Sequence, residues 1–104
     1  MKIYVDQHRT VTVEDRLGLH MRVAQQIVKA AQRFRSTLTI RREHILADAK
    51  SILGILMLGA VQGAVLDLHA SGEDAEAALY EIAHLIDPKC DDLDSGPTTP
   101  TEVG

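Results

Sequence analysis

Hydrophobic and polar residues alternate in three stretches of the chain, each of which predicts a β-strand with one buried face, and a fourth, short strand is predicted between the second and the last of them. The first stretch centres on Val11 and Val13. Ile3 and Val5 are at odd positions, like Val11 and Val13, and would lie on the same face, so this strand can extend back toward the N-terminus. The other predicted strands cover residues 37–41, 45–48 and 65–70.

Three other segments have helical spacing. The first follows His20 and places its apolar residues on one face: Ala24, Ile27, Val28, Ala31 and Phe34. The second is short and apolar on nearly all sides, with Ser51 as its N-cap and Gly59 as its terminator. The third has Asp74 as its N-cap and a buried stripe of Ala75, Ala78, Leu79, Ile82, Ala83 and Ile86.

The predicted order of elements is therefore β-α-β-β-α-β-α. Two strand-helix-strand arms of this kind favour an α+β two-layer sandwich, in which a four-stranded antiparallel or mixed sheet is covered by helices on one face. A tight turn at Glu43-His44 would join the second and third strands, although neither residue is the Gly or Asn that such a turn prefers. A chain of 104 residues suffices for one compact domain.

The end of the chain differs in character from the rest. Residues 87–104 combine Asp-Pro, a cluster of acidic residues and a Ser-Gly-Pro-Thr-Thr-Pro-Thr run, which together offer little to bury. We interpret this segment as a flexible acidic tail. The folded domain is then residues 1–86, with an aliphatic core, because aromatic residues make up only 3% of the chain.

Composition narrows the possible functions. A net charge of −4 argues against a nucleic-acid partner. The single cysteine, Cys90, cannot form an intrachain disulfide and fits a reducing cytoplasm. The longest apolar stretch, residues 52–61, is too short to cross a membrane, and no signal peptide is recognisable. No metal site is expected, because the histidines outside position 20 lack ligand spacing: His8, His44, His69 and His84.

The segment Gly18-Leu19-His20-Met21-Arg22 carries the most specific chemistry. It lies between a strand and a helix, so the histidine faces the unpaired first amides of the helix, which favour anions. Arg22 offers a planar fork of donors to phosphate oxygens. An imidazole nitrogen is nucleophilic near neutral pH. Taken without its context, His20 would be a surface histidine at a helix start, but here it predicts a phosphoryl acceptor.

Ordered short motifs identify a known family. They are Gly18-Leu19-His20-x-Arg22, Ala49-Lys50-Ser51-Ile52, Leu58-Gly59-Ala60, Gln62-Gly63 and Gly72-Glu73-Asp74. With this order and spacing over about residues 7–86, the chain resembles the phosphocarrier protein HPr family of the bacterial phosphoenolpyruvate:sugar phosphotransferase system.

The resemblance implies a role for the whole chain. His20 would be phosphorylated by enzyme I, with phosphoenolpyruvate as the source, and would pass the group to the A domain of a sugar permease. Arg22 would help to hold the phosphoryl group. The protein would be a monomeric, stoichiometric carrier rather than an enzyme, with no cofactor, and would have the family's open-faced sandwich of four antiparallel strands and three helices.

The resemblance also concerns the second helix. The serine matching Ser51 is, in many members, phosphorylated by HPr kinase/phosphorylase, and Ile52, Leu53 and Leu56 match the apolar patch that docks on partners. Ser51 is explained equally well as an N-cap, so its phosphorylation stays open. For the same helix the apolar pattern predicts that Ile55 and Leu58 face inward and the others partly outward.

Two other functions are alternatives to the sugar-import carrier. One is a regulatory paralogue that controls carbon or nitrogen metabolism through Ser51 phosphorylation and binding to a transcriptional regulator. Another is a phosphatase with a phosphohistidine, which is disfavoured because no second acid or base is recognisable.

Two departures from the family pattern stand out. Most members have proline where this chain has Val23, which puts the start of the first helix in question. The acidic tail has no counterpart in the shorter members and points to a specialised paralogue.

Overall fold

The computed structural model describes residues 5–89 of the chain. Its elements are β1 (Val5–Thr12), α1 (Met21–Ala31), β2 (Thr37–Arg42), β3 (Ile45–Asp48), α2 (Ile52–Met57), β4 (Val65–Gly72) and α3 (Ala75–Ile86). This order confirms the predicted β-α-β-β-α-β-α arrangement. The proposed extension of the first strand to Ile3 lies outside the described residues.

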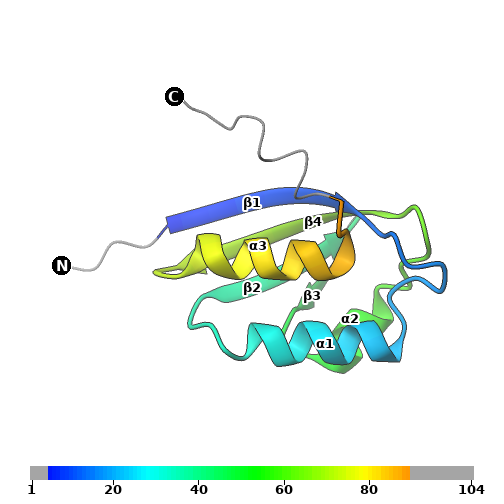
Figure 1. Cartoon of the computed structure of the whole chain (residues 1–104), viewed down its shortest axis with the longest axis horizontal. Helices are drawn as coiled ribbons and strands as arrows, with labels where there is room; N and C mark the ends of the chain where they lie inside the picture. The colour runs from blue at the N-terminus through cyan, green and yellow to red at the C-terminus, as the bar shows by residue number, and fades with distance from the viewer. Residues whose placement is uncertain (1–4, 90–104) are drawn as a thin grey trace.

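The strands form one sheet in the order β1-β4-β2-β3, and every neighbouring pair is antiparallel. All three helices lie on the same side of this sheet, while its other face is open (Figure 1). The α+β sandwich is thus confirmed, and the sheet is antiparallel rather than mixed. None of the helices formed by residues 5–89 combines the length and the hydrophobicity of a membrane-spanning segment.

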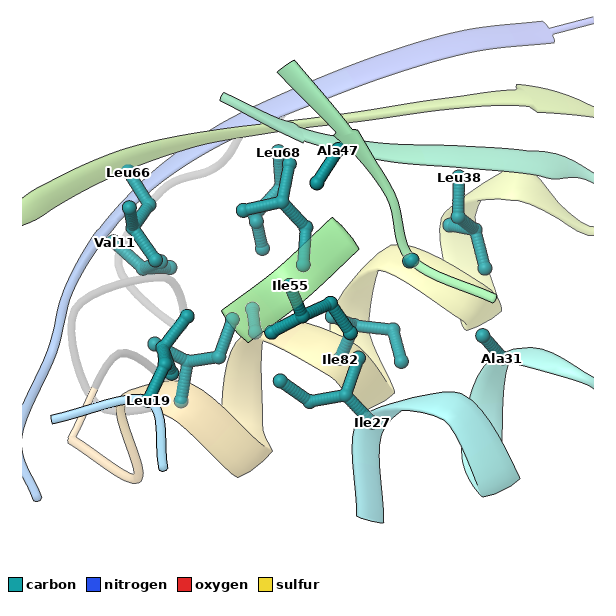
Figure 2. Close-up of a cluster of buried hydrophobic side chains, with 14 of the residues drawn as sticks. Val11, Leu19, Ile27, Ala31, Leu38, Ala47, Ile55, Leu66, Leu68 and Ile82 are labelled. Atoms are coloured by element: carbon teal, nitrogen blue, oxygen red, sulfur yellow. The ribbon is translucent and has the colours of Figure 1, made fainter. Parts of the chain in front are cut away.

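The core is aliphatic, as the composition predicts. Each helix contributes one fully buried isoleucine: Ile27 from α1, Ile55 from α2 and Ile82 from α3. These side chains point toward Leu66 and Leu68 on the covered face of the sheet (Figure 2). Burying one such side chain is worth roughly 1.5–3 kcal/mol, so this cluster holds the two layers together.

Asp74 occupies the N-cap position of α3, but its side chain does not cap the helix. The carboxylate instead accepts hydrogen bonds from the backbone N–H groups of Arg35 and Ser36, at 2.9 and 3.0 Å, and from the Ser36 hydroxyl. The φ and ψ of Asp74, −107° and 26°, are not the extended values that a capping side chain needs. Asp74 therefore ties the start of α3 to the segment before β2, which corrects the prediction of a helix cap.

The β2–β3 turn contains a strained residue. Glu43 has a φ of 56°, in the left-handed region that glycine or asparagine normally occupies. The strand register brings Arg42 opposite Ile45, so only Glu43 and His44 are left to reverse the chain. Pairing of the two strands imposes the turn despite its weak sequence signal.

Asp87 belongs with the folded unit rather than with the tail. It is buried, and one carboxylate oxygen accepts a hydrogen bond from the backbone N–H of Thr12 at 3.3 Å. The other oxygen accepts one from the N–H of Lys89 at 3.2 Å. The rest of the predicted tail, residues 90–104 with Cys90, lies outside the described residues.

Candidate functional site

His20 is the N-cap residue of α1. Its backbone is extended, with φ −87° and ψ −179°, and its carbonyl accepts the first helical hydrogen bond, from Ala24 N–H at 2.9 Å. The imidazole makes no capping bond, and the side chain is 28% exposed. The ring therefore lies at the start of a helix, accessible to solvent, where the sequence places it.

Val23 is the third residue of α1 and is buried. Because the first helical bond is donated by Ala24, the N–H of Val23 precedes the hydrogen-bonded part of the helix. The valine in place of the family's proline thus leaves the helix starting directly after His20.

The loop before His20 is fixed against the loop between α2 and β4. Leu19 N–H donates to the Ala60 carbonyl at 3.0 Å, and Val13 N–H donates to the Ala64 carbonyl at 2.9 Å. Gly18 has a φ of 74°, which favours glycine, and a Cβ there would lie 2.3 Å from the Ala60 oxygen. Hydrogen bonds and close packing thus hold the backbone that carries His20 in one conformation.

Asp15 is the site residue that the sequence did not predict. Its Oδ2 lies 3.4 Å from His20 Nε2, and its Oδ1 accepts a hydrogen bond from Leu17 N–H at 2.8 Å. The Leu17 bond is the largest cause that lowers the pKa of Asp15; His20 and Arg22 lower it further, while desolvation opposes them. A signal was present: Asp15 and Gly18 are the first and last residues of a β-turn, the positions that Asp and Gly favour.

Arg22 is exposed on the first turn of α1. It is close enough to Asp15 to lower the pKa of that carboxyl. With residues 5–89 its guanidinium makes no hydrogen bond or ion pair. Its donors are therefore available to a phosphate.

Ser51 is the N-cap of α2, as predicted. Its Oγ accepts a hydrogen bond from Gly54 N–H at 3.0 Å, and the residue is half-buried. The hydroxyl proton is not needed for this bond, so the cap leaves the hydroxyl free to donate elsewhere.

Helix α2 divides its apolar residues as expected. Ile55 and Leu58 are fully buried, whereas Leu53 is 68% exposed, and Ile52 and Leu56 are half-buried. Further large apolar side chains that the sequence analysis did not single out are also exposed: Leu17, Met21, Met57 and Val61. Apolar exposure thus extends from α2 to the residues that flank the His20 loop.

Other histidines lie on the open face of the sheet. His8 and His69 face each other on β1 and β4, and with Arg41 and Asp67 they line part of a hollow of about 300 Å³. Among residues 5–89, no group of three or more His, Cys, Asp or Glu side chains is placed to hold a metal ion.

The chain is similar to known phosphocarriers along most of its length. Residues 7–87 match the family described as "PTS HPr component phosphorylation site". "Phosphocarrier protein NPr" of Shewanella violacea is 40% identical over 84 residues, which are 81% of this chain and 92% of the relative. "Phosphocarrier protein HPr" of Treponema pallidum is 42% identical over 81 residues, covering 78% and 92%.

The fold comparison agrees. The crystal structure of a phosphocarrier protein HPr from Bacillus anthracis superposes with a TM-score of 0.75 and 32% identity, covering 78% of this chain and 96% of that one. The chain therefore belongs to the HPr family of phosphocarrier proteins.

Proposed function

We propose that this phosphocarrier accepts a phosphoryl group from enzyme I on His20, with phosphoenolpyruvate as the source, and passes it to the A domain of a sugar permease. The observation that carries the proposal is the imidazole of His20 at the N-terminus of α1, partly exposed and without a capping bond. Nearby Arg22 has no hydrogen bond or ion pair with residues 5–89. A nucleophile and a free cation thus occupy the start of one helix.

The chemistry needs little more than this. A ring nitrogen of His20 forms a bond to phosphorus while the bond between phosphorus and the donor breaks, and the electron pair leaves with the donor. The unpaired amides at the start of α1 and the guanidinium of Arg22 offset the charge of the phosphoryl oxygens. The hydrogen-bonded loop keeps the backbone of His20 in place, so little backbone ordering is required when a partner binds.

Partner binding is assigned to the apolar residues of α2. Leu53 is largely exposed, with the half-buried Ile52 and Leu56 beside it. Large apolar side chains left in water favour a protein contact that removes them from it. On this proposal the surface brings enzyme I and the permease A domain to the same face as His20.

The test is a two-step transfer of labelled phosphate. Purified chain is incubated with enzyme I and phosphoenolpyruvate, and an A domain is then added. We expect acid-labile, base-stable label on the chain, which then moves to the A domain. His20→Ala should take up no label, whereas His44→Ala, which removes an exposed histidine from the β2–β3 turn, should behave as wild type. Label on His20→Ala would overturn the proposal.

A regulatory role is the second candidate. The relatives include proteins named NPr, at 40% and 37% identity, as well as proteins named HPr. Ser51 is half-buried at the start of the proposed docking helix, where a phosphate would alter partner binding. Phosphorylation of Ser51 by HPr kinase/phosphorylase and subsequent binding to a transcriptional regulator, with no transfer to any sugar permease A domain, would favour this role. Neighbouring sugar permease genes would favour import.

A further inference from the structure

Helices α1 and α3 lie side by side and run in opposite directions, with a groove between them on the surface of the helix layer (Figure 1). The groove has a volume of about 410 Å³. Its floor is apolar, because Ala30 is buried and Leu85 is half-buried. Six residues line it: Gln26, Lys29, Ala30 and Arg33 of α1, with Glu81 and Leu85 of α3. The groove therefore has room for an apolar side chain.

The wall of the groove on the α1 side is basic. Arg33 forms an ion pair with Glu81 across the groove. Lys29 is exposed and makes no hydrogen bond or ion pair with residues 5–89. Arg22, which is also without such a partner in the described part of the chain, lies one turn before Gln26 on the same face of α1. One wall thus carries two cations that are free to meet carboxylates.

The chain leaves the described domain close to this groove. Lys89 is fixed beside the loop that follows β1, because its Nζ lies 3.7 Å from a carboxylate oxygen of Glu14 and its N–H donates to Asp87. Leu85 on the groove floor is only four residues earlier in the sequence. Four further residues, 90–93, cover about 13 Å when extended. Residue 93 can therefore return to the groove without any change in the domain.

The sequence that follows complements the groove in both polarity and charge. Residues 91–94 are Asp-Asp-Leu-Asp, so one leucine lies among three carboxylates. The only other large aliphatic residue of the segment 90–104 is Val103, which has a single acidic neighbour. An apolar floor beside unpaired cations favours a leucine flanked by aspartates.

We propose that residues 91–94 fold back and dock into the groove between α1 and α3. Leu93 packs against Leu85 and Ala30, and the neighbouring carboxylates lie beside Lys29. Docking of this kind does not depend on phosphoryl transfer by His20, and it gives the acidic segment a binding surface on its own domain.

The contact is weak. Exposed ion pairs contribute little to stability, and a leucine in an open groove is only partly removed from water. We expect the segment to be docked about half of the time, which stabilises the fold by RT ln 2, about 0.4 kcal/mol. Thermal unfolding barely registers a contribution of this size, so the test needs a probe of proximity.

A spin label placed just after the acidic cluster supplies this probe. Cys90→Ser removes the native thiol, and Ser95→Cys provides the labelling position. In the ¹⁵N-labelled full chain, the nitroxide broadens the amide signals of residues that it approaches. We expect strong broadening at Lys29 and Ala30 and none along β3, which lies at the far edge of the sheet.

A pair of matched variants separates docking from tethering near the domain. Leu93→Ser removes the apolar anchor, whereas Val103→Ser makes a similar change outside the acidic cluster. We expect Leu93→Ser to reduce the broadening at Ala30 roughly two- to three-fold. Val103→Ser should leave it unchanged.

A second pair tests the charge. Lys29→Gln should reduce the broadening at Ala30 roughly 1.5-fold, because it removes the cation beside the carboxylates. Arg35→Gln is the control, since Arg35 is an exposed arginine beyond the other end of α1, next to the start of α3. It should leave the broadening unchanged.

No broadening at Ala30, or equal broadening in the labelled chain with and without Leu93→Ser, would overturn the proposal. A mixture of spin-labelled chain without ¹⁵N and ¹⁵N-labelled chain without the spin label tests for a different occupant. We expect sharp Ala30 signals in this mixture. Broadening there would show that the groove receives the segment of a second copy, which would overturn docking within one chain.

Discussion

Gly18 packs against the backbone of Ala60 so closely that a Cβ at Gly18 would lie 2.3 Å from the Ala60 carbonyl oxygen. This contact joins the loop that carries His20 to the loop before β4, and the two loops run side by side at the right of Figure 1. The position of His20 therefore depends on a glycine two residues away and on a loop distant in sequence.

Gly18→Ala tests this contact. The variant combines an unfavourable positive φ with a backbone clash, so we expect it to lower the free energy of unfolding by about 2–4 kcal/mol. Gly63→Ala is the matched control: Gly63 has a φ of 90°, but nothing lies within 4 Å of a Cβ there. Its cost should be about 1–2 kcal/mol, from strain alone. Urea unfolding measures the loss in free energy of unfolding for each variant. Equal losses would contradict the prediction, because they would show that the backbone at Ala60 moves to accommodate a Cβ at Gly18.

Asp74 should make stability depend on pH in the acid range. The Ser36 hydroxyl, followed by the N–H of Arg35, lowers the pKa of Asp74 below its ordinary value of 3.8. A lowered pKa in the folded state means that Asp74 stabilises the fold fully above its unfolded pKa, and that this contribution is lost as the pH falls through the folded pKa. Asp74→Asn should therefore be less stable than wild type at neutral pH, with the difference shrinking below about pH 4. A difference that stays constant down to pH 2 would contradict this.

Charge at Ser51 should oppose phosphorylation by enzyme I. Ser51→Asp keeps an N-cap acceptor for Gly54 N–H but adds a negative charge beside Ile52 and Leu53. Ser51→Asn keeps the cap without the charge and serves as the control. We expect both variants to unfold within about 0.5 kcal/mol of wild type, and only the aspartate to slow phosphorylation of His20 by enzyme I. Equal phosphorylation rates for the two variants would show that a negative charge at position 51 does not affect the reaction with enzyme I.

Two truncations locate the end of the folded unit. Removal of residues 90–104 should leave the melting temperature within about two degrees of wild type, because this sequence offers little to bury. Removal of residues 87–104 also deletes Asp87 and its bond to Thr12 N–H, and should cost about 1–2 kcal/mol more. Differential scanning calorimetry compares the two. A large loss in the shorter truncation would mean that the acidic segment packs on the domain.

The sequence predicted most of the fold because burial in a two-layer sandwich repeats with a simple period. Val11, Leu66 and Leu68 alternate with polar neighbours, and Ile27 and Ile82 recur at helical spacing, so each pattern identified its element. His20 and Arg22 were predictable because local sequence places both at one helix start. In each case the signal is local.

What the sequence missed depends on contacts between distant or irregular segments. Asp15 meets His20 only because of the turn at Gly18, whose geometry no hydrophobic period encodes. The Asp74 carboxylate does not cap its own helix, because it accepts three hydrogen bonds from Arg35 and Ser36, which are far away in sequence. Asp87 lies in a stretch whose composition is typical of a flexible tail, yet it is buried and accepts a hydrogen bond from Thr12 N–H.

A single NMR spectrum can show whether His20 carries the phosphoryl group. The ¹⁵N-labelled chain is phosphorylated with enzyme I and phosphoenolpyruvate, and the phosphorus–nitrogen coupling is assigned to a residue. We expect coupling to the His20 ring alone, with Arg22→Ala forming the same adduct more slowly. Phosphate on any other histidine, or on Ser51, would contradict it.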